Sequence, residues 1–314
     1  MLSLSIPSYS KPSGYQLSEL AKPEISDPKD VIIRVHAASI NPIDVKKADG
    51  LLKFAMKDTE FVKCTEKYIA LKPPSLSFED AASIPLAAMT ALQALGKYKG
   101  DLTEKTVFVP AGLSGTGLFA CQLAKNVFHA GKVITTVSTS KVDKINDLLG
   151  EGTVDEIIDY TKIDPRKVIK SGSVDFLFDT VGSALEYLCL MNQKSGCIVS
   201  VATMPSGNQL QEYSLMDLPQ QGGVPFALRM GLNAFDWVRK LRAWRYGVEY
   251  SYMFLESSGE DLDELRKYVE ENKLRTVVGN SVELSDIEAV RSACQTVYSG
   301  KGGLGKLVVK VADS

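Results

Sequence analysis

Short apolar runs alternate with turns and helical segments through the middle of the chain. Residues 106–110 (TVFVP) predict a strand, and residues 118–131 (LFACQLAKNVFHAG) repeat apolar positions at helical spacing until Gly131 ends the pattern. Residues 132–137 (KVITTV) predict the next strand. A strand, a helix and a strand in this order predict two parallel strands joined by a right-handed crossover.

The same alternation continues through residue 203. Further strands and helices are expected at 155–160 (DEIIDY), 174–182 (VDFLFDTVG), 183–192 (SALEYLCLMN) and 196–203 (GCIVSVAT). Regular alternation of this kind predicts an α/β fold with a doubly wound parallel sheet of the Rossmann type.

The segments on either side of this region predict a second domain. Residues 30–40 (DVIIRVHAASI) alternate and are rich in β-branched side chains, which indicates one strand, and the end of the chain returns to a strand pattern in GKLVVKV. We therefore expect residues 1–84 and 273–314 to pair into one domain, interrupted by a Rossmann domain over residues 85–272.

Proline and glycine refine the helical predictions. Residues 77–98 are rich in alanine and leucine, and Pro85 is expected to divide them into two helices because proline cannot donate a backbone hydrogen bond. Residues 205–235 contain proline, glycine and glutamine and indicate a loop. Residues 234–246 predict a helix with basic residues on one face.

Composition restricts the possible partners. A net charge of −2 over 314 residues provides no basic field for nucleic acid. The longest apolar runs are far shorter than the roughly 20 residues that a membrane span needs. The first residues, MLSLSIPSYSKPSGY, do not have the pattern of a secretory signal, so we expect a cytoplasmic protein.

Histidine and cysteine are too scattered to predict a metal site. The two histidines are His36 and His129, and the five cysteines include no C-x-x-C pair. A catalytic zinc ion usually takes three His, Cys or carboxylate ligands. We expect neither zinc nor a disulfide framework.

A glycine-rich turn follows the strand at residues 106–110. Gly112, Gly115 and Gly117 are a spacing variant of the dinucleotide-binding G-x-G-x-x-G, and they stand where a strand ends and a helix begins. Glycine lets the backbone approach a pyrophosphate, and the helix N-terminus offers free amides to that anion. We therefore expect the cofactor to contact Gly112, Ser114, Gly115, Thr116 and Gly117. The alternative is a tight turn that binds nothing.

The end of the second strand discriminates between cofactors. An NAD site usually has an acidic residue there to bind the ribose 2′-hydroxyl. This chain has Ser138, Thr139, Ser140 and Lys141, with no carboxylate before Asp143. Hydroxyl groups and an ammonium suit a 2′-phosphate, so the sequence favours NADPH. Ser140 could also be a helix N-cap with Lys141 in solvent, and both roles are compatible.

These segments resemble the quinone oxidoreductase-like, zinc-free medium-chain dehydrogenases/reductases, and among them the fungal trans-acting enoyl reductases of polyketide pathways. The resemblance covers nearly the whole chain. It implies a Rossmann domain inserted in a GroES-like β-barrel domain. The matching segments are SINPIDVKKADG (39–50), LKPPSLSFEDAASIPLAAMTALQAL (71–95), VFVPAGLSGTGLFACQLAK (107–125), VITTVSTSK (133–141), DEIIDYTK (155–162), VDFLFDTVG (174–182) and GKGGLGKLVVKV (300–311).

The resemblance also implies roles for individual residues. Asn41, Lys46 and Thr90 match residues near the nicotinamide and the substrate carbonyl, and Tyr160 resembles a tyrosine beside the adenosine phosphate. For each of them the alternative is a structural turn or strand end. Residues that would line the ribose and the nicotinamide are Thr180, Val181, Val201, Ala202, Phe254 and Leu255.

One part of the family pattern is missing. Between N-P-I-D and P-S-L-S-F-E, family members carry a G-x-D-x-x-G-x-V segment and a G-D-x-V segment of the barrel. Here LLKFAMKDTEFVKCTEKYIAL leads from Gly50 almost directly to Pro73. The barrel must be truncated, and residues 51–69, residues 205–247 or a second subunit must cover what it exposes. We therefore expect a homodimer.

The combined prediction is an NADPH-dependent reductase that transfers hydride to an enone, enoyl thioester or quinone, and the resemblance implies a small, polyketide-like substrate. Two alternatives stay open. One is an isomerase or cyclase that keeps the fold without the redox step, and the other is a non-catalytic NADPH-binding protein.

Overall fold

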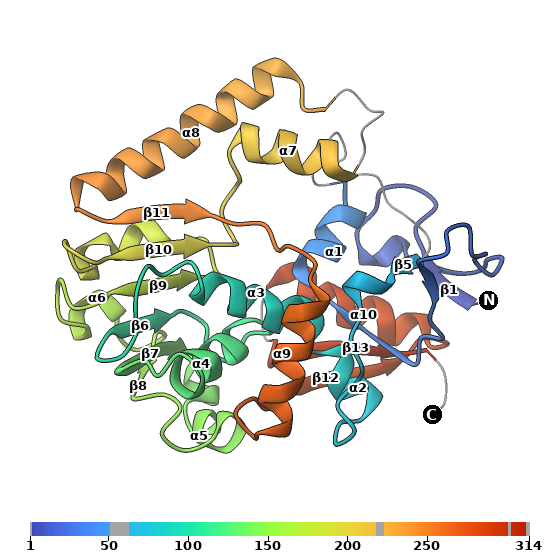
Figure 1. Cartoon of the computed structure of the whole chain (residues 1–314), viewed down its shortest axis with the longest axis horizontal. Helices are drawn as coiled ribbons and strands as arrows, with labels where there is room; N and C mark the ends of the chain where they lie inside the picture. The colour runs from blue at the N-terminus through green and yellow to red at the C-terminus, as the bar shows by residue number, and fades with distance from the viewer. Residues whose placement is uncertain (1, 51–62, 218–222, 301–302, 312–314) are drawn as a thin grey trace. The chain divides into compact units, whose positions relative to one another are not determined.

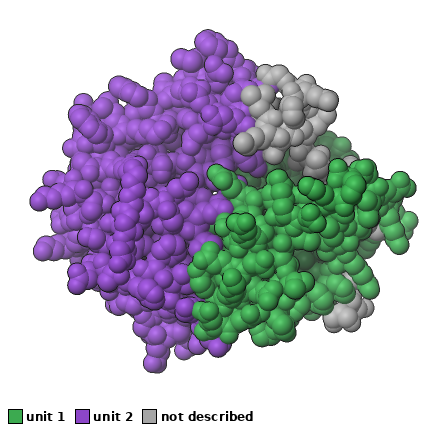
Figure 2. Space-filling model, viewed as in Figure 1, with its two compact units in different colours: residues 1–89, 256–271, 276–314 green, residues 90–255, 272–275 purple. Residues whose placement is uncertain are grey.

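The computed structural model describes residues 2–50, 63–217, 223–300 and 303–311 (Figure 1). The chain divides into two compact units (Figure 2). The inner unit comprises Thr90–Leu255 and Asn272–Arg275. The outer unit comprises Met1–Met89, Glu256–Glu271 and Thr276–Ser314.

The inner unit is built on one parallel six-stranded sheet, so the predicted α/β fold is confirmed. Numbered by their order in the chain, its strands lie in the spatial order 3-2-1-4-5-6, which is the doubly wound order of dinucleotide-binding sheets. In that order the strands are β8 (Glu156–Asp159), β7 (Lys132–Val137), β6 (Thr106–Val109), β9 (Phe176–Asp179), β10 (Cys197–Ser200) and β11 (Glu249–Tyr252).

Helices cover both faces of this sheet, as a parallel sheet requires. The first eight residues of α4 (Gly117–Asn126), from Gly117 to Ala124, are buried. A cluster of buried side chains, including Phe108, Ile134, Leu177 and Ile198, joins the strands to η4 (Ala184–Leu190) and α8 (Phe226–Arg245). The remaining short helices are η3 (Thr139–Lys141), α5 (Lys144–Leu149) and α6 (Pro165–Val168).

The expected loop over residues 205–235 is wrong. Helix α7 (Gly207–Asp217) and helix α8 occupy most of it, and residues 218–222 lie outside the described residues. Only Leu232, Asp236 and Ala243 of α8 are buried, while apolar side chains also stand on its exposed side. The second half of α8 agrees with the helix expected over residues 234–246. In the first half the helical period was not visible, because apolar residues do not form a single stripe.

In its described residues, the outer unit holds three small sheets. Strand β13 (Lys306–Lys310) runs parallel to β12 (Val278–Glu283) and antiparallel to β4 (Ala37–Ile40), so segments on either side of the inner unit in the sequence share one sheet. The other pairs are β1 (Leu2–Ser5) with β2 (Gln16–Glu19) and β3 (Asp30–Ile32) with β5 (Lys63–Thr65), both antiparallel.

Two details of this unit differ from the predictions. Residues 30–40 form two strands rather than one, because β3 and β4 join different sheets, and the exposed Ile33 lies between them. Helix α9 (Gly259–Glu270) belongs to the outer unit, where a β-carbon on Gly259 would lie 2.7 Å from the carbonyl oxygen of Lys67. The close packing of backbone on backbone ties the start of α9 to the short helix η2 (Glu66–Tyr68).

The helices of the outer unit follow local signals. Pro85 begins α3, as the sequence predicts, and the division between the units falls within this helix. The helices are η1 (Pro12–Gly14), α1 (Pro42–Ala48), α2 (Phe78–Ala82), α3 (Pro85–Leu95) and α10 (Ile287–Ser299). Among the described residues, no helix is both long enough and apolar enough to cross a bilayer.

Candidate cofactor and catalytic site

The carboxyl ends of the parallel strands place most of the predicted cofactor residues on one edge of the inner sheet. The glycine turn follows β6, and Thr180 follows β9, the strand at which the order of the sheet reverses. The hydroxyl of Thr180 donates to the carbonyl oxygen of Pro110 at 3.1 Å and joins the two strand ends. Ligands of doubly wound sheets bind at this reversal point.

Packing alone explains two of the three glycines. A β-carbon on Gly112 would lie 2.1 Å from Oγ1 of Thr135, a hydroxyl that donates to the carbonyl oxygen of Val109 at 2.6 Å. A β-carbon on Gly117 would lie 2.3 Å from the carbonyl oxygen of Ala111. Both positions require glycine whether or not a ligand binds.

The tip of the turn is the part that suits a pyrophosphate. Ser114, Gly115 and Thr116 are partly exposed, whereas Gly112 and Gly117 are buried. Oγ of Ser114 accepts a hydrogen bond from the amide of Gly117 at 3.1 Å, which fixes the turn at the start of α4. The ten-residue α4 directs its positive end to this tip, so the turn fits a dinucleotide phosphate.

A carboxylate that the sequence analysis missed lies at the predicted 2′-phosphate site. The hydroxyl of Thr139 donates to Oδ2 of Asp159 at 2.6 Å, and the hydroxyl of Thr161 donates to Oδ1 at 2.6 Å. These hydroxyls, Thr139 first, lower the pKa of Asp159 to about 2, so the carboxylate is ionised at neutral pH. Nζ of Lys162 lies 3.5 Å from Oδ2 and offsets part of this charge.

The other residues at this end follow β7 in the short helix η3. Ser138 precedes it, and Lys141 closes it. Burial, and after it the charge of Lys144, lowers the pKa of Lys141. Ser140 lies inside η3 and Asp143 precedes α5, so the alternative of Ser140 as a helix N-cap is not found.

Asp179 organises the two loops that were expected to line the ribose and the nicotinamide. Its side chain is fully buried, and Oδ1 accepts from the amides of Val181, Gly182 and Ser183 at 3.3, 2.8 and 3.1 Å. Its Oδ2 accepts from the hydroxyl of Ser200 at 2.8 Å, next to Val201. Sequence reasoning missed this carboxylate, although its position at the end of a buried strand was a usable signal.

The remaining predicted residues of the inner unit occupy varied environments. Phe254 stacks on Tyr213 with ring centroids 4.4 Å apart, and Leu255 follows it at the end of the unit. Tyr160 comes directly after β8 with 56% of its surface exposed. Thr90 is buried in α3.

The predicted catalytic residues of the outer unit lie on α1, and the structure adds a buried lysine to them. Asn41 is the N-cap of α1 and is 5% exposed, while Lys46 stands exposed in the last turn. Oδ2 of Asp44 accepts from the backbone amide of Asn41 at 2.8 Å and from its Nδ2 at 3.2 Å. The ammonium of Lys306, only 4% exposed, donates to Oδ1 of Asn41.

The environment of Lys306 changes its acidity. Burial lowers the pKa of Lys306 to about 8, and the nearby charge of Asp44 opposes the shift. Neutral and charged forms of this amine are thus both accessible near physiological pH. The only sequence signal was a lysine directly before the apolar run Leu307–Val309.

The donor set does not fit zinc. In the ranges that the structure describes, no three His, Cys, Asp or Glu side chains come together as metal ligands. Cys121, Cys197 and Cys294 are free and buried, and burial raises the pKa of each thiol. No step of the reaction is therefore assigned to a metal.

Comparison with known proteins gives a family and several relatives. The model of the zinc-binding dehydrogenase family matches residues 152–309, half of the chain. NAD(P)H oxidoreductase RTN4IP1, mitochondrial, of Danio rerio is 27% identical over 93% of this chain and 86% of its own length. The 2-methylene-furan-3-one reductase of Solanum lycopersicum is 29% identical over 65% of this chain and 66% of its own. The chloroplastic NADPH-dependent alkenal/one oxidoreductase of Arabidopsis thaliana is 29% identical over 52% and 53%.

A solved structure agrees with these relatives. The quinone oxidoreductase from Coxiella burnetii superposes with a TM-score of 0.76 at 26% identity, over 99% of both chains. The fold and its relatives therefore point to the same class of protein.

Proposed function

The chain belongs to the zinc-binding dehydrogenase family, and we propose that it is an NADPH-dependent, zinc-independent reductase of activated C=C bonds. It is an oxidoreductase of the medium-chain type, and its relatives are NAD(P)H oxidoreductases. The proposal of an NADPH-dependent reductase rests chiefly on one observation. The glycine turn, the Thr139 region and the Asp179 loops share the carboxyl edge of one parallel sheet.

The cofactor would be held along that edge. Gly115 and Thr116 with the start of α4 would bind the pyrophosphate, and Ser138 with Lys141 the 2′-phosphate. The loops that Asp179 fixes would support the nicotinamide ribose. When bound, NADPH supplies the hydride.

Asn41, Lys46 and Thr90 remain our proposed contacts to the nicotinamide and the substrate. The Nδ2 of Asn41 donates to Asp44 at 3.2 Å and, less closely, to the carbonyl oxygen of Ser39 at 3.4 Å. The longer of these contacts is the one that a substrate oxygen would replace. The N–H group would then polarise the substrate carbonyl while Lys306 and Asp44 hold the amide plane.

The names of relatives support an unsaturated carbonyl compound or a quinone as substrate. We propose that the chain reduces an enone, an enoyl thioester or a quinone. We propose that its natural substrate is a polyketide-like intermediate of secondary metabolism. We also propose a cytoplasmic location, although relatives carry mitochondrial and chloroplastic names. A fluorescent fusion of the full chain tests the location.

The deciding experiment is incubation of the purified protein and NADPH with a panel of enones, quinones and enoyl thioesters, in the presence of a chelator. We expect NADPH consumption and, for alkenes, a product heavier by two hydrogens, observed by mass spectrometry. A product of unchanged mass would instead support an isomerase or cyclase on the same fold. Nucleotide binding without turnover of any compound would support a non-catalytic NADPH-binding protein.

We further propose a homodimer. Helix α8 carries a row of exposed apolar side chains at helical spacing, Phe226, Met230, Trp237 and Trp244, and β11 beside it is an edge strand of the sheet. A surface of this kind is typical of a protein–protein contact.

A further inference from the structure

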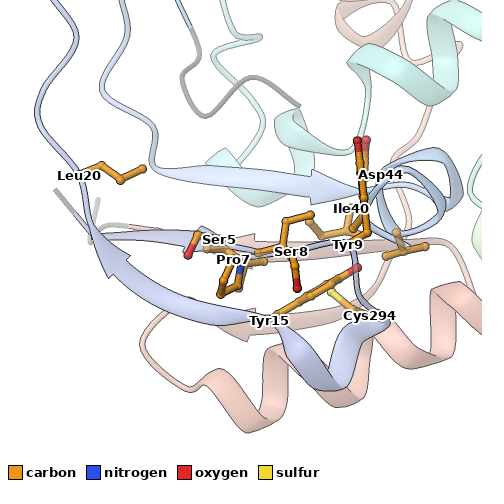
Figure 3. A pocket seen from close by; sticks show the side chains of 13 residues that line it. Ser5, Pro7, Ser8, Tyr9, Tyr15, Leu20, Ile40, Asp44 and Cys294 are labelled. Carbon is orange, nitrogen blue, oxygen red and sulfur yellow. The ribbon is translucent and has the colours of Figure 1, made fainter. Parts of the chain in front are cut away.

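A cavity of about 490 Å³ opens within the outer unit (Figure 3). It lies among the first two strands, helix α1 and helix α10. Of its described lining residues, Asp44 alone belongs to the proposed reductase site, where it holds the amide of Asn41. Most of the lining is aliphatic and includes Leu4, Ile6, Leu20, Ile40 and Val45. Its size and apolar character are those of small-molecule sites.

The wall of this cavity contains a buried hydroxyl without a partner. Tyr15 is 3% exposed, and among the described residues its hydroxyl has no hydrogen-bond partner. Figure 3 shows its ring beside the thiol of Cys294. Burial raises the pKa of Tyr15, so the group stays a protonated donor. A buried hydroxyl that makes no hydrogen bond is costly, and an acceptor in the cavity would remove that cost.

The other polar groups of the lining are already engaged or stand at the rim. The hydroxyl of Ser5 accepts from the hydroxyl of Ser18 at 3.0 Å, and the carboxylate of exposed Asp44 accepts from Asn41. No lysine or arginine is among the described lining residues, whereas Asp44 brings a negative charge. An anion would therefore meet repulsion without a compensating cation.

We propose that this cavity binds an uncharged, largely aliphatic small molecule whose carbonyl or ether oxygen accepts a hydrogen bond from Tyr15. The aliphatic lining takes the hydrocarbon part, and Tyr15 fixes the orientation. The proposed hydrogen bond is made by Tyr15, which has no part in the proposed reductase chemistry, so either proposal can hold without the other.

Calorimetric titration of the full chain, without nucleotide, tests this with 2-undecanone and with undecanoate. The ketone has no C=C bond to reduce, and the two probes share an alkyl chain of similar length. We expect saturable binding of the ketone and at least about tenfold weaker binding of the carboxylate. Tyr15→Phe should weaken ketone binding about five- to tenfold, the usual effect of one neutral hydrogen bond, without lowering the melting temperature.

Two further variants test whether the ketone binds in this cavity and not elsewhere on the chain. In Tyr298→Phe, the matched control, the lost hydroxyl donates to Asp49 at 2.5 Å outside the cavity, so ketone binding should not change. Ala48→Leu fills the cavity and should abolish binding in a folded protein. The proposal is overturned if the ketone does not bind, if it binds Ala48→Leu normally, or if Tyr15→Phe lowers the melting temperature, since that loss would show that the hydroxyl already has a partner.

Discussion

Lys306 donates a hydrogen bond to Asn41 across 265 residues of sequence, and both side chains are almost completely buried. The bond joins the first residue of β13 to the N-cap of α1. The amide oxygen of Asn41 and the carboxylate of Asp44 stabilise the buried ammonium of Lys306.

This burial predicts a specific dependence of stability on pH. The pKa of Lys306 is lowered to about 8 in the folded state, below the value of the unfolded chain. Between those two values the unfolded state binds more protons at this site, so the free energy of unfolding rises with pH. Urea unfolding measures the free energy of unfolding at pH 7.5 and at pH 9.5. Between these two pH values it should rise by about 2 kcal/mol more for the unmutated chain than for Lys306→Met. Buried cysteines and tyrosines affect both proteins equally, and parallel pH curves would contradict the prediction.

Asp179→Asn should disturb both stability and cofactor binding. The carboxylate accepts from three backbone amides and from Ser200, so we expect a loss of about 2–3 kcal/mol and a clearly weaker affinity for NADPH. The matched control is Asp175→Asn, at the opposite end of the same strand. Asp175 accepts from the amide of Thr106 at 3.0 Å and from Ser195 at 2.6 Å. Its variant should lose stability but keep nucleotide affinity, and an equal effect on affinity in both variants would refute the special role of Asp179.

The choice between NADPH and NADH should respond oppositely to two changes. Lys141→Ala removes a cation from the 2′-phosphate site and should reduce the preference for NADPH about tenfold or more. Asp159→Asn removes the neighbouring anion and should increase that preference. Fluorescence titration with both nucleotides measures the two ratios. Equal affinity for the two nucleotides in the unmutated chain would end the NADPH assignment.

Replacing two glycines of the same turn should have different effects, one on nucleotide binding and the other on the stability of the fold. Gly115→Val should abolish nucleotide binding in a protein that still folds, because a branched side chain would fill the space for the pyrophosphate. Gly112→Ala should destabilise the fold instead, since its β-carbon would collide with Thr135. Circular dichroism melting and nucleotide titration separate the two effects. Normal NADPH binding by a folded Gly115→Val protein would refute the position of the phosphate.

The proposed dimer depends on helix α8. Trp237 and Trp244 are 63% and 71% exposed, and each should become buried at the contact. A charge at the core of such a contact is strongly unfavourable, so Trp237→Glu with Trp244→Glu should give a monomer by light scattering. Lys46→Glu, on an exposed position of the outer unit, is the control. A monomeric unmutated chain would contradict this interface.

The sequence by itself determined the parallel sheet, the glycine turn after β6 and the division of the helices at Pro85. These features depend on local rules: apolar periodicity, the missing amide of proline and the conformational freedom of glycine act within a few residues. The family resemblance rests on the same short segments, so it too was accessible without coordinates.

Only the tertiary structure decided how these segments combine into a site. Asp159 reaches Thr139 because β8 lies beside β7, and Lys306 reaches Asn41 because β13 pairs with β4. The first half of helix α8 was hidden because its apolar side chains do not all face the core, whereas the second half matches the helix expected over residues 234–246. Hydrogen bonds and burial between residues distant in sequence depend on the pairing of strands, and no local pattern of residues records that pairing.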